Sequence, residues 1–288
     1  MLQKKSNTSI KIMISFLLSA LVWWSCETSP TIQQKTGLDS THIITTLPTE
    51  KIDTVAAFFK PSKLVAAKID SNTRVIYLTM DDGPLAPSDM LRQIAEGKNI
   101  KISEFAVGKH AFISKTLMHH LEDMRASPNM EVLNHSYSHA NGRYEHYYHN
   151  PEFAFNDIMN NQTKLNITQK IVRMPGRDIW ATPRLKLGWK QNGGSTASML
   201  FNNGYTVYGW DIEWEHYGKS SLPKVTPEKF VAMVDEAFSN SEMATHNHLV
   251  ILGHDEMLIH ERGKSDFVRI VDMLIQRGYV FEFISNYP

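Results

Sequence analysis

Short apolar runs alternate with amphipathic helical segments over most of the chain, and this alternation constrains the fold more than any other feature. Seven runs are rich in β-branched and aromatic residues and are bounded by turn-forming residues, as strands are. These predicted strands cover residues 75–79, 102–107, 130–134, 170–174, 205–212, 248–252 and 279–284. In five segments between them, apolar residues recur at helical spacings of three and four. These predicted helices cover residues 88–96, 113–125, 151–165, 226–238 and 266–277.

Strands that alternate with helices indicate parallel βα units, because a parallel neighbour needs a crossover connection that a helix usually supplies. The pattern fits either an open sheet or a sheet closed as a barrel. We predict a single α/β domain over residues 69–288 with about seven parallel strands. In both architectures functional side chains gather beyond the C-terminal ends of the strands. Residues at those ends are therefore the first candidates for a functional site.

The N-terminal segment has the plan of an export signal. Three lysines begin it, and the uncharged, mostly apolar run 12–24 follows. As a helix this run spans about 20 Å, which is short of the ~30 Å hydrocarbon core of a bilayer. Cys26 follows Ser25 directly after the run, as at a bacterial lipoprotein processing site. An ordinary secretory signal with an incidental cysteine is the alternative.

We therefore predict a lipoprotein signal over residues 1–26, with Cys26 as the lipidated residue. Residues 27–68 are rich in Thr, Ser, Pro, Gln and Lys and have little apolar periodicity, so we predict a polar tether. The protein would then be exported from the cytoplasm and held at the cell envelope, and it would meet the membrane only through its lipid anchor.

The charge balance and the cysteine count exclude several classes of protein. Thirty Lys and Arg residues balance thirty Asp and Glu residues, without a long basic run. The chain thus lacks the electrostatic footprint of a nucleic-acid-binding protein, and we expect no nucleic-acid partner. Its single cysteine cannot form an intramolecular disulfide or a thiolate metal site. A metal ion would need nitrogen and oxygen ligands, to which thirteen histidines could contribute.

Two predicted strand ends carry residue types that bind metal ions. Asp81 and Asp82 follow the first predicted strand, and His135 and His139 follow the third. One carboxylate and two imidazoles suit a divalent ion such as Zn, Co, Ni or Fe, and the second carboxylate could act as a base. The alternatives are a turn cap for the Asp-Asp-Gly-Pro segment and surface histidines in a histidine-rich stretch.

Three further strand ends carry polar groups. Arg173 begins Arg-Met-Pro-Gly-Arg, where a fixed cation could hold a carboxylate base ionised. Trp210 begins Trp-Asp-Ile-Glu-Trp, which combines acids with stacking surfaces. His254 follows the strand 248–252 and could be a general acid, although a lone histidine is more often structural. The recurrence of polar groups at successive strand ends favours a shared functional site.

The order of these motifs resembles the polysaccharide deacetylases of carbohydrate esterase family 4, also called the NodB homology domain. The similarity covers residues 74–284. Thr-Met-Asp-Asp-Gly-Pro at 79–84 is similar to the family's TFDDGP motif, with Met for Phe, and 135–139 fits its HSxxH motif. The resemblance implies a distorted (β/α) barrel and one divalent metal ion, commonly zinc. It implies Asp81 as the catalytic base and Asp82, His135 and His139 as the metal ligands.

The resemblance also assigns residues around the substrate. Ile251 to His254 fits the family's LxxH motif, which implies His254 as the general acid beside an apolar slot for the acetyl methyl group. In the third motif an aromatic residue is missing after Pro175, so the oxyanion-stabilising N–H would come from Gly176 or Arg177.

The fourth motif also departs from the family, which ends it in Asp-Trp, with an acid that tunes the catalytic histidine. Aligning on Trp210 places His216 and Tyr217 there, and leaves Asp211 or Glu213 as substitute acids. The long stretch 178–203 is unusual as well. It is either a substrate-facing loop or an extra helix with its tryptophans in the core.

These observations lead to one main hypothesis. The chain would be an exported, metal-dependent hydrolase that removes N- or O-linked acetyl groups from a polysaccharide or oligosaccharide. One rival is a carbohydrate-binding protein of the same fold with impaired catalysis, which the altered third and fourth motifs favour. The other is a metal hydrolase that acts on a different C–N or ester bond, since fold does not determine function.

Overall fold

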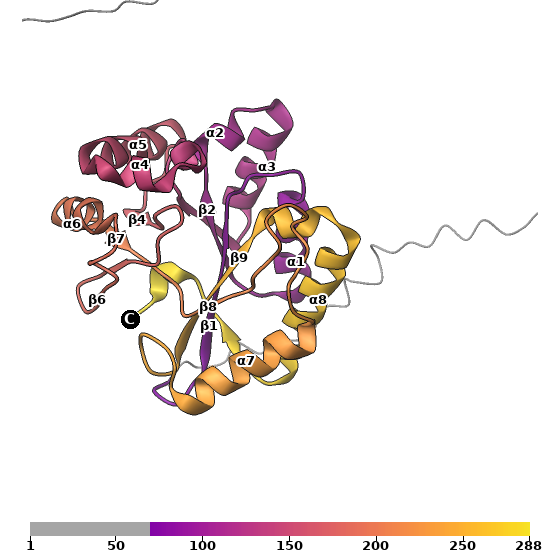
Figure 1. The fold of residues 1–288 in the computed structure, drawn as a ribbon. Helices are drawn as coiled ribbons and strands as arrows, with labels where there is room; N and C mark the ends of the chain where they lie inside the picture. Colours follow the sequence, from indigo (N-terminus) through magenta and orange to yellow (C-terminus); the bar gives the residue numbers. More distant parts are fainter. Residues whose placement is uncertain (1–69) are drawn as a thin grey trace, which may run out of the picture. The chain divides into compact units, whose positions relative to one another are not determined.

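A mostly parallel sheet curls through the centre of the domain, and helices surround it (Figure 1). The computed structural model describes residues 70–288, all within one unit of the chain, Ile52–Pro288. The predicted signal, the tether and Cys26 lie outside the described residues. The strands are β1 (Val75–Asp81), β2 (Ile102–Ala106), β3 (Met130–Asn134), β4 (Ile171–Val172), β5 (Trp180–Ala181), β6 (Lys186–Leu187), β7 (Thr206–Val207), β8 (Ile212–Glu213), β9 (His248–His254) and β10 (Val280–Phe281).

The strand order is β6-β5-β7-β4-β3-β2-β1-β9-β8, and β10 pairs with the start of β1. The outermost strands of this path, β6 and β8, do not pair with each other in the described domain, so the barrel is open. The predicted α/β architecture, a distorted barrel in a single domain, is confirmed. The pairs β5–β6 and β5–β7 are antiparallel, and the other pairs of strands in the sheet are parallel.

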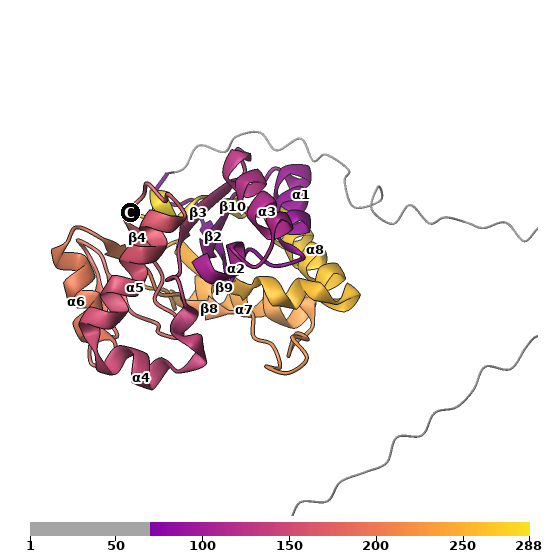
Figure 2. The ribbon, with the colours of Figure 1, turned by 90° about the horizontal axis from the view of Figure 1, so that it is seen from above.

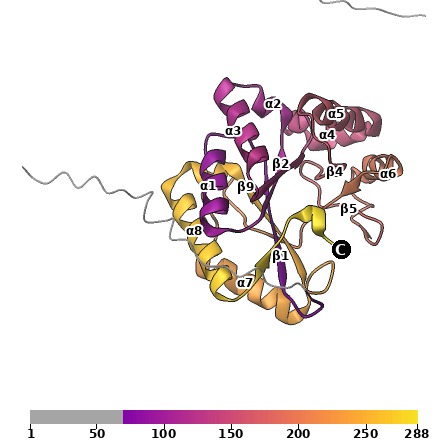
Figure 3. The same cartoon turned by 180° about the vertical axis from the view of Figure 1, so that it is seen from behind.

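The helices form two groups when the domain is seen from above (Figure 2) and from behind (Figure 3). One group holds α1 and α3 beside α8, and the other holds α4, α5 and α6. The helices are α1 (Ser88–Lys98), α2 (Gly108–Ala111), α3 (Lys115–Ala126), α4 (Tyr144–His149), α5 (Pro151–Lys164), α6 (Gly194–Asn202), α7 (Pro227–Asn240) and α8 (Glu261–Gln276), with short 3-10 turns at His139–Gly142, Asp255–Ile259 and Ile284–Asn286.

Local capping determines where several helices begin. Asn150 accepts a hydrogen bond from the backbone N–H of Phe153 at the start of α5, and Thr226 does the same for Lys229 in α7. In both helices proline occupies the first turn, where its missing N–H costs nothing. None of the helices in residues 70–288 combines the length and the apolar character that a membrane span requires.

Both faces of the central strand are buried, as expected for a covered parallel sheet. Ile76, Leu78 and Met80 of β1 pack in the cluster between the sheet and the helices. Val75 and Tyr77 belong to a second cluster, on the other face of the sheet. A buried strand therefore delivers its last residue, Asp81, to the edge where the neighbouring strands also end.

The structure differs from the prediction in two regions. The predicted strand 205–212 is two separate strands: β7 pairs with β4, whereas β8 pairs with β9. The stretch 178–203 forms the β5–β6 hairpin and α6. Trp180 is 2% exposed and packs against Tyr208 and Tyr287, and the Nε1–H of the partly buried Trp189 donates to the carbonyl of Trp180. This stretch therefore contributes an extra helix and a core tryptophan.

Candidate active site

Strand register brings the predicted site residues to one edge of the sheet. Asp81 is level with His254 across the β1–β9 ladder. On the other side of β1, Ala106 of β2 is level with Asn134, directly before His135. Asn134 is in turn level with Val172, directly before Arg173. Five parallel strands thus end together, and their last or next residues lie at the same edge of the sheet.

The segment after β1 is held by its backbone. Asp82 has a φ of 78°, and its carbonyl accepts a hydrogen bond of 2.6 Å from Nδ1 of His110 in α2. The N–H of Gly83 donates to a carboxylate oxygen of Glu104 at 2.9 Å. The positive φ turns the chain sharply, so Asp81 and Asp82 meet different partners although they are adjacent.

Asp82, His135 and His139 form a group that could hold a metal ion. Their candidate ligand atoms lie within 4.8 Å of one another. Oδ1 of Asp82 lies 3.0 Å from Nε2 of His139 and 3.6 Å from Nε2 of His135. This oxygen is buried and has no hydrogen-bond partner among the described residues, as expected of an atom that serves as a metal ligand. One carboxylate and two imidazoles suit zinc and its neighbours in the first transition series.

The protonation states of this group also suit a cation. Burial lowers the pKa of both His135 and His139 to about 3, so both rings are neutral. Nδ1–H of His135 donates to the carbonyl of Arg173 at 2.8 Å, which leaves Nε2 as the ligand atom. Burial, with the charge of Asp81, raises the pKa of Asp82 well above its usual range. A divalent ion bound beside Asp82 would stabilise the ionised form of its carboxylate.

Removal of one imidazole should lower metal affinity while the fold survives. We expect His139→Ala to weaken binding by at least about 10-fold, because a ligand atom is lost. Zn²⁺ titration and elemental analysis measure this effect, with His146→Ala as the control. His146 is an exposed histidine of the nearby α4 and should not matter. Equal metal content in wild type and His139→Ala would refute the assignment.

Asp81 shares His135 with this group, since its Oδ2 lies 3.5 Å from Nε2 of His135, but it also has a partner of its own. Its Oδ1 accepts a hydrogen bond from Nη1 of Arg173 at 3.0 Å, and its side chain is only 4% exposed. Arg173 is completely buried and also donates to Oγ1 of Thr79 and to the carbonyl of Gly209. The guanidinium stacks on the ring of Phe105, 4.4 Å from its centroid. Asp81 is therefore held in place by an immobile cation.

His254 has a histidine neighbour where a carboxylate was expected. Its ring lies against His216, with 5.2 Å between ring centroids, and Nε2 of His216 lies 3.3 Å from Oε1 of Glu256. Nδ1 of His254 is buried and has no hydrogen-bond partner among the described residues. Burial lowers the pKa of His254 to about 4, and the charge of Asp81 opposes this shift.

The two substitute acids proposed from the fourth motif lie elsewhere. The carboxylate of Asp211 accepts hydrogen bonds of 2.7 Å from the backbone N–H groups of Ala244 and Val250, so it ties a loop to β9. Burial raises the pKa of Asp211 to about 6. Glu213 lies half-buried on β8. The acid that does reach this region, Glu256, is two residues after His254, and sequence analysis missed it because its motif ended at the histidine.

The third motif forms a tight turn. The N–H of Arg177 donates to the carbonyl of Met174, so it is not free to bind an oxyanion, whereas Gly176 is exposed with a φ of 62°. Pro175 is buried, and its carbonyl accepts a hydrogen bond from the Tyr148 hydroxyl. Gly176 therefore remains the candidate of the two for an oxyanion-binding N–H.

Tyr144 of α4 is a polar neighbour of the site that sequence analysis missed. Its ring lies over Gly176, where an added Cβ would be 3.0 Å from it, and its hydroxyl is 3.5 Å from Nε2 of His139. Burial and the charge of Asp82 raise the pKa of Tyr144 to about 12, which keeps the hydroxyl protonated and able to donate. No spacing in the sequence linked α4 to the strand ends.

Two residues predicted to contact substrate differ in their placement. Trp210 is partly exposed, and its ring lies 5.9 Å from the guanidinium of Arg173, close to the site. Ile251, in contrast, is 1% exposed and packs in the core between sheet and helices. Alternate residues of a strand face opposite sides, so Ile251 points away from the side of β9 that carries His254 only three residues later. This placement corrects the expected role of Ile251 in lining an acetyl slot.

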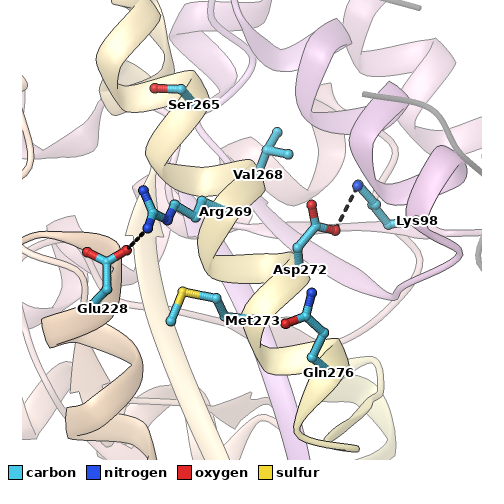
Figure 4. A pocket seen from close by; sticks show the side chains of 8 residues that line it. All are labelled: Lys98, Glu228, Ser265, Val268, Arg269, Asp272, Met273 and Gln276. Atoms are coloured by element: carbon cyan, nitrogen blue, oxygen red, sulfur yellow. Dashed lines mark ion pairs between the residues drawn. The ribbon is translucent and has the colours of Figure 1, made fainter. Parts of the chain in front are cut away.

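A groove of about 510 Å³ lies outside this site, on α8 beside the ends of α1 and α7 (Figure 4). Its charged side chains are already paired. Lys98 contacts Asp272 at 2.7 Å, and Arg269 contacts Glu228. The groove therefore offers no unpaired charge to a ligand, and the strand-end cluster remains the candidate active site.

Comparisons with known proteins agree with this geometry. Residues 68–183 match the family model described as polysaccharide deacetylase. A polysaccharide deacetylase from Bacillus cereus is 23% identical, with a TM-score of 0.53, over 75% of this chain and 95% of that one. A family 4 carbohydrate esterase from Streptomyces lividans, solved with acetate, is 20% identical, with a TM-score of 0.51, over 73% and 92%.

A third solved structure is the catalytic domain of a peptidoglycan N-acetylglucosamine deacetylase from Eubacterium rectale. It is 20% identical, with a TM-score of 0.53, over 77% of this chain and 93% of that one. The comparison with curated protein sequences gave no match. At these identities the solved structures establish the fold, and the segment matched by the family model contains residues 79–84, 135–139 and 173–177.

Proposed function

Because residues 68–183 belong to the polysaccharide deacetylase family and the domain has the fold of its solved relatives, we propose that this chain hydrolyses acetyl groups from a glycan. The observation that carries the proposal is the meeting of three elements at one sheet edge. These are the Asp81–Arg173 pair, the cation-binding group of Asp82, His135 and His139, and His254. The substrate would be an N- or O-acetylated polysaccharide or oligosaccharide.

The proposed mechanism assigns one task to each group. A divalent ion, once bound, would polarise the acetyl carbonyl and lower the pKa of water. Asp81, positioned by its hydrogen bond from Arg173, accepts the proton of the attacking water. As the C–N or C–O bond breaks, the protonated form of His254 donates a proton to the leaving nitrogen or oxygen, and the proton that Asp81 accepted is then released and balances the one that His254 gave up. The products are acetate and the free amine or hydroxyl of the glycan.

One observation favours a second candidate, a carbohydrate-binding member with impaired catalysis. His254 lies beside His216 and not beside a carboxylate, and a cationic His216 would disfavour protonation of His254. One structural relative, 15% identical with a TM-score of 0.52, is described as a mutant of a family 4 pseudoenzyme with restored activity. Against this candidate, Asp81, Arg173 and the cation-binding group are all present.

Acetate release separates the two candidates. We expect the purified chain to release acetate from one or more of acetylated chitin oligomers, peptidoglycan and acetylated xylan, and addition of Zn²⁺, Co²⁺ or Ni²⁺ to a chelated sample to restore the rate. Glycan binding without acetate release, at every metal tested, would favour the binding protein. Release from an acetylated non-glycan substrate alone would favour a hydrolase of a different bond.

The N-terminal hypothesis has its own test. We propose that the chain is exported and anchored in the cell envelope through Cys26, which lies outside the described residues. Cys26→Ser should abolish acyl labelling and leave either an unprocessed precursor or a differently cleaved soluble form. Unchanged labelling and membrane partition would eliminate the lipoprotein hypothesis and leave an ordinary secretory signal.

A further inference from the structure

Two buried carboxyl groups lie directly behind the segment that carries Asp81 and Asp82. Glu104 belongs to the middle of β2, and Asp255 follows the end of β9; both are completely buried. Both touch the backbone at Gly83. A Cβ added there would lie 2.4 Å from Oε1 of Glu104 and 2.8 Å from Oδ2 of Asp255. A side chain at this position would therefore push both carboxyl groups out of their places.

The pair ties down the segment after Asp82. Oε1 of Glu104 accepts the hydrogen bond from the N–H of Gly83. Oδ2 of Asp255 accepts a short hydrogen bond from the hydroxyl of Ser88, and Oγ of Ser88 accepts from the N–H of Leu85 at 2.7 Å. The two carboxyl groups thus connect β2, β9 and the start of α1 to a single turn.

The two carboxyl groups lie close together, since one oxygen of each would be within 3 Å of the same Cβ at Gly83. Ionised carboxylates only accept hydrogen bonds, so carboxyl groups this close can bond to each other only if one of them carries a proton. Neither group forms an ion pair with a basic side chain in residues 70–288. Their other oxygens, Oε2 of Glu104 and Oδ1 of Asp255, are buried without a hydrogen-bond partner there. Two adjacent charges in such a site would repel without compensation.

The charges around Glu104 and Asp255 also favour retention of a proton by the pair. Asp81 and Asp82 add negative charge near the pair. Two histidines face the same turn: His110 of α2 through the carbonyl of Asp82, and His120 of α3 through that of Leu85. Their rings contact the backbone and not the pair. Burial, and after it the charge of Asp255, raises the pKa of Glu104 well above its usual range.

We propose that Glu104 and Asp255 share one proton and are positioning residues for the turn that presents Asp81 and Asp82. The catalytic consequence rests on the proposed function, whereas the shared proton does not. The pair touches neither substrate nor metal ligand side chains, and acts through the backbone of Gly83 and Leu85. Loss of the shared proton would place two charges against this backbone and loosen the turn.

The pH dependence has a definite sign. A carboxyl group whose pKa is raised by folding contributes stability at low pH, and this contribution is lost as pH rises through the folded-state pKa. The wild-type chain should therefore lose stability as pH rises from the ordinary pKa of a glutamate to the raised pKa of Glu104, and the loss should level off above it. Glu104→Gln should remove this loss, because its amide can donate to Asp255 and accept from Gly83 without titrating.

Infrared difference spectroscopy and denaturation at several pH values test the shared proton in the full chain without metal. Wild type should show the carbonyl stretch of a buried protonated carboxylic acid in addition to any band from Asp82, whose pKa is also raised, and Glu104→Gln should lose the additional band. The matched control is Glu131→Gln. Glu131 is a buried carboxylate of β3 that accepts hydrogen bonds from Ser103 and Ser285, away from the turn. The Glu131→Gln control should keep both the infrared band and the loss of stability with rising pH.

A second measurement tests positioning. Glu104→Ala removes the bond to Gly83 and should weaken Zn²⁺ binding by about 10 to 100-fold, and Glu104→Gln by less, since residues behind a metal site typically have effects of this size. If Glu104→Ala does not fold, the infrared spectrum and pH profile of Glu104→Gln still test whether the pair shares a proton. The proposal is overturned if Glu104→Gln keeps the wild-type band and pH profile. An inactive wild type with these spectroscopic results would contradict only the proposed function.

Discussion

Asp81→Asn should lose turnover by about 100 to 10,000-fold and still bind metal and glycan, because the loss of a general base has an effect of this size. The structure provides the basis for this separation. Both aspartates lie near Nε2 of His135, but only Asp81 accepts a hydrogen bond from the buried Arg173, and only Asp82 also contacts His139, at 3.0 Å. Acetate release, Zn²⁺ titration and glycan binding, measured on the same preparation, check the expectation.

Asp82→Asn is the matched comparison. The two variants change the same atoms in adjacent residues, but Asp82→Asn should lose Zn²⁺ first and turnover as a consequence. Excess Zn²⁺ should therefore restore some activity to Asp82→Asn and none to Asp81→Asn. Acetate release at the wild-type rate by Asp81→Asn, or loss of metal by Asp81→Asn alone, would show that the assigned roles are wrong.

Arg173→Met should lower the free energy of unfolding by about 3–5 kcal/mol, the usual cost of leaving one member of a buried ion pair without its partner. Arg173 is completely buried and donates hydrogen bonds to Asp81, Thr79 and Gly209. A methionine fills much of the space but leaves each of these acceptors without its donor. Denaturant unfolding at neutral pH measures the change.

Arg177→Met provides the control for Arg173→Met. Arg177 is four residues away and pairs with Glu145, whose side chain is 82% exposed. Exposed ion pairs contribute little to stability, so Arg177→Met should be much closer to wild type. Equal losses for the two variants would mean that the Arg173–Asp81 contact has no special energetic role.

The sequence predicted the long elements well and the short ones poorly. The predicted strand 130–134 matches β3, and the predicted helix 151–165 ends one residue after α5. Long amphipathic segments carry their own periodicity, which survives in the fold. The two-residue strands β5 and β6 have no such pattern, since tertiary pairing creates them. The run 205–212 looked continuous because nothing local indicates that its two ends pair with different strands.

The candidate site was predictable where adjacent residues leave one strand together, and less so where distant segments meet. Asp81, Asp82 and His254 follow strands, so alternation alone placed them at one edge. Ile251 was wrongly given a place at the site, since a strand residue three positions from His254 faces the other side. Glu104 was not predicted from the sequence, because no motif distinguishes a carboxyl group in the middle of a strand.

The level ends of β1 and β9 have a consequence for how this protein could change over time. Asp81 and His254 are register partners, so the span between proton acceptor and proton donor is set by the spacing of neighbouring strands, about 4.8 Å between backbones. That spacing is a property of every sheet and depends on no loop. Insertions after β4 or β8 could therefore change the surface around the proposed site, while the distance between the proposed base and the proposed acid would stay constant.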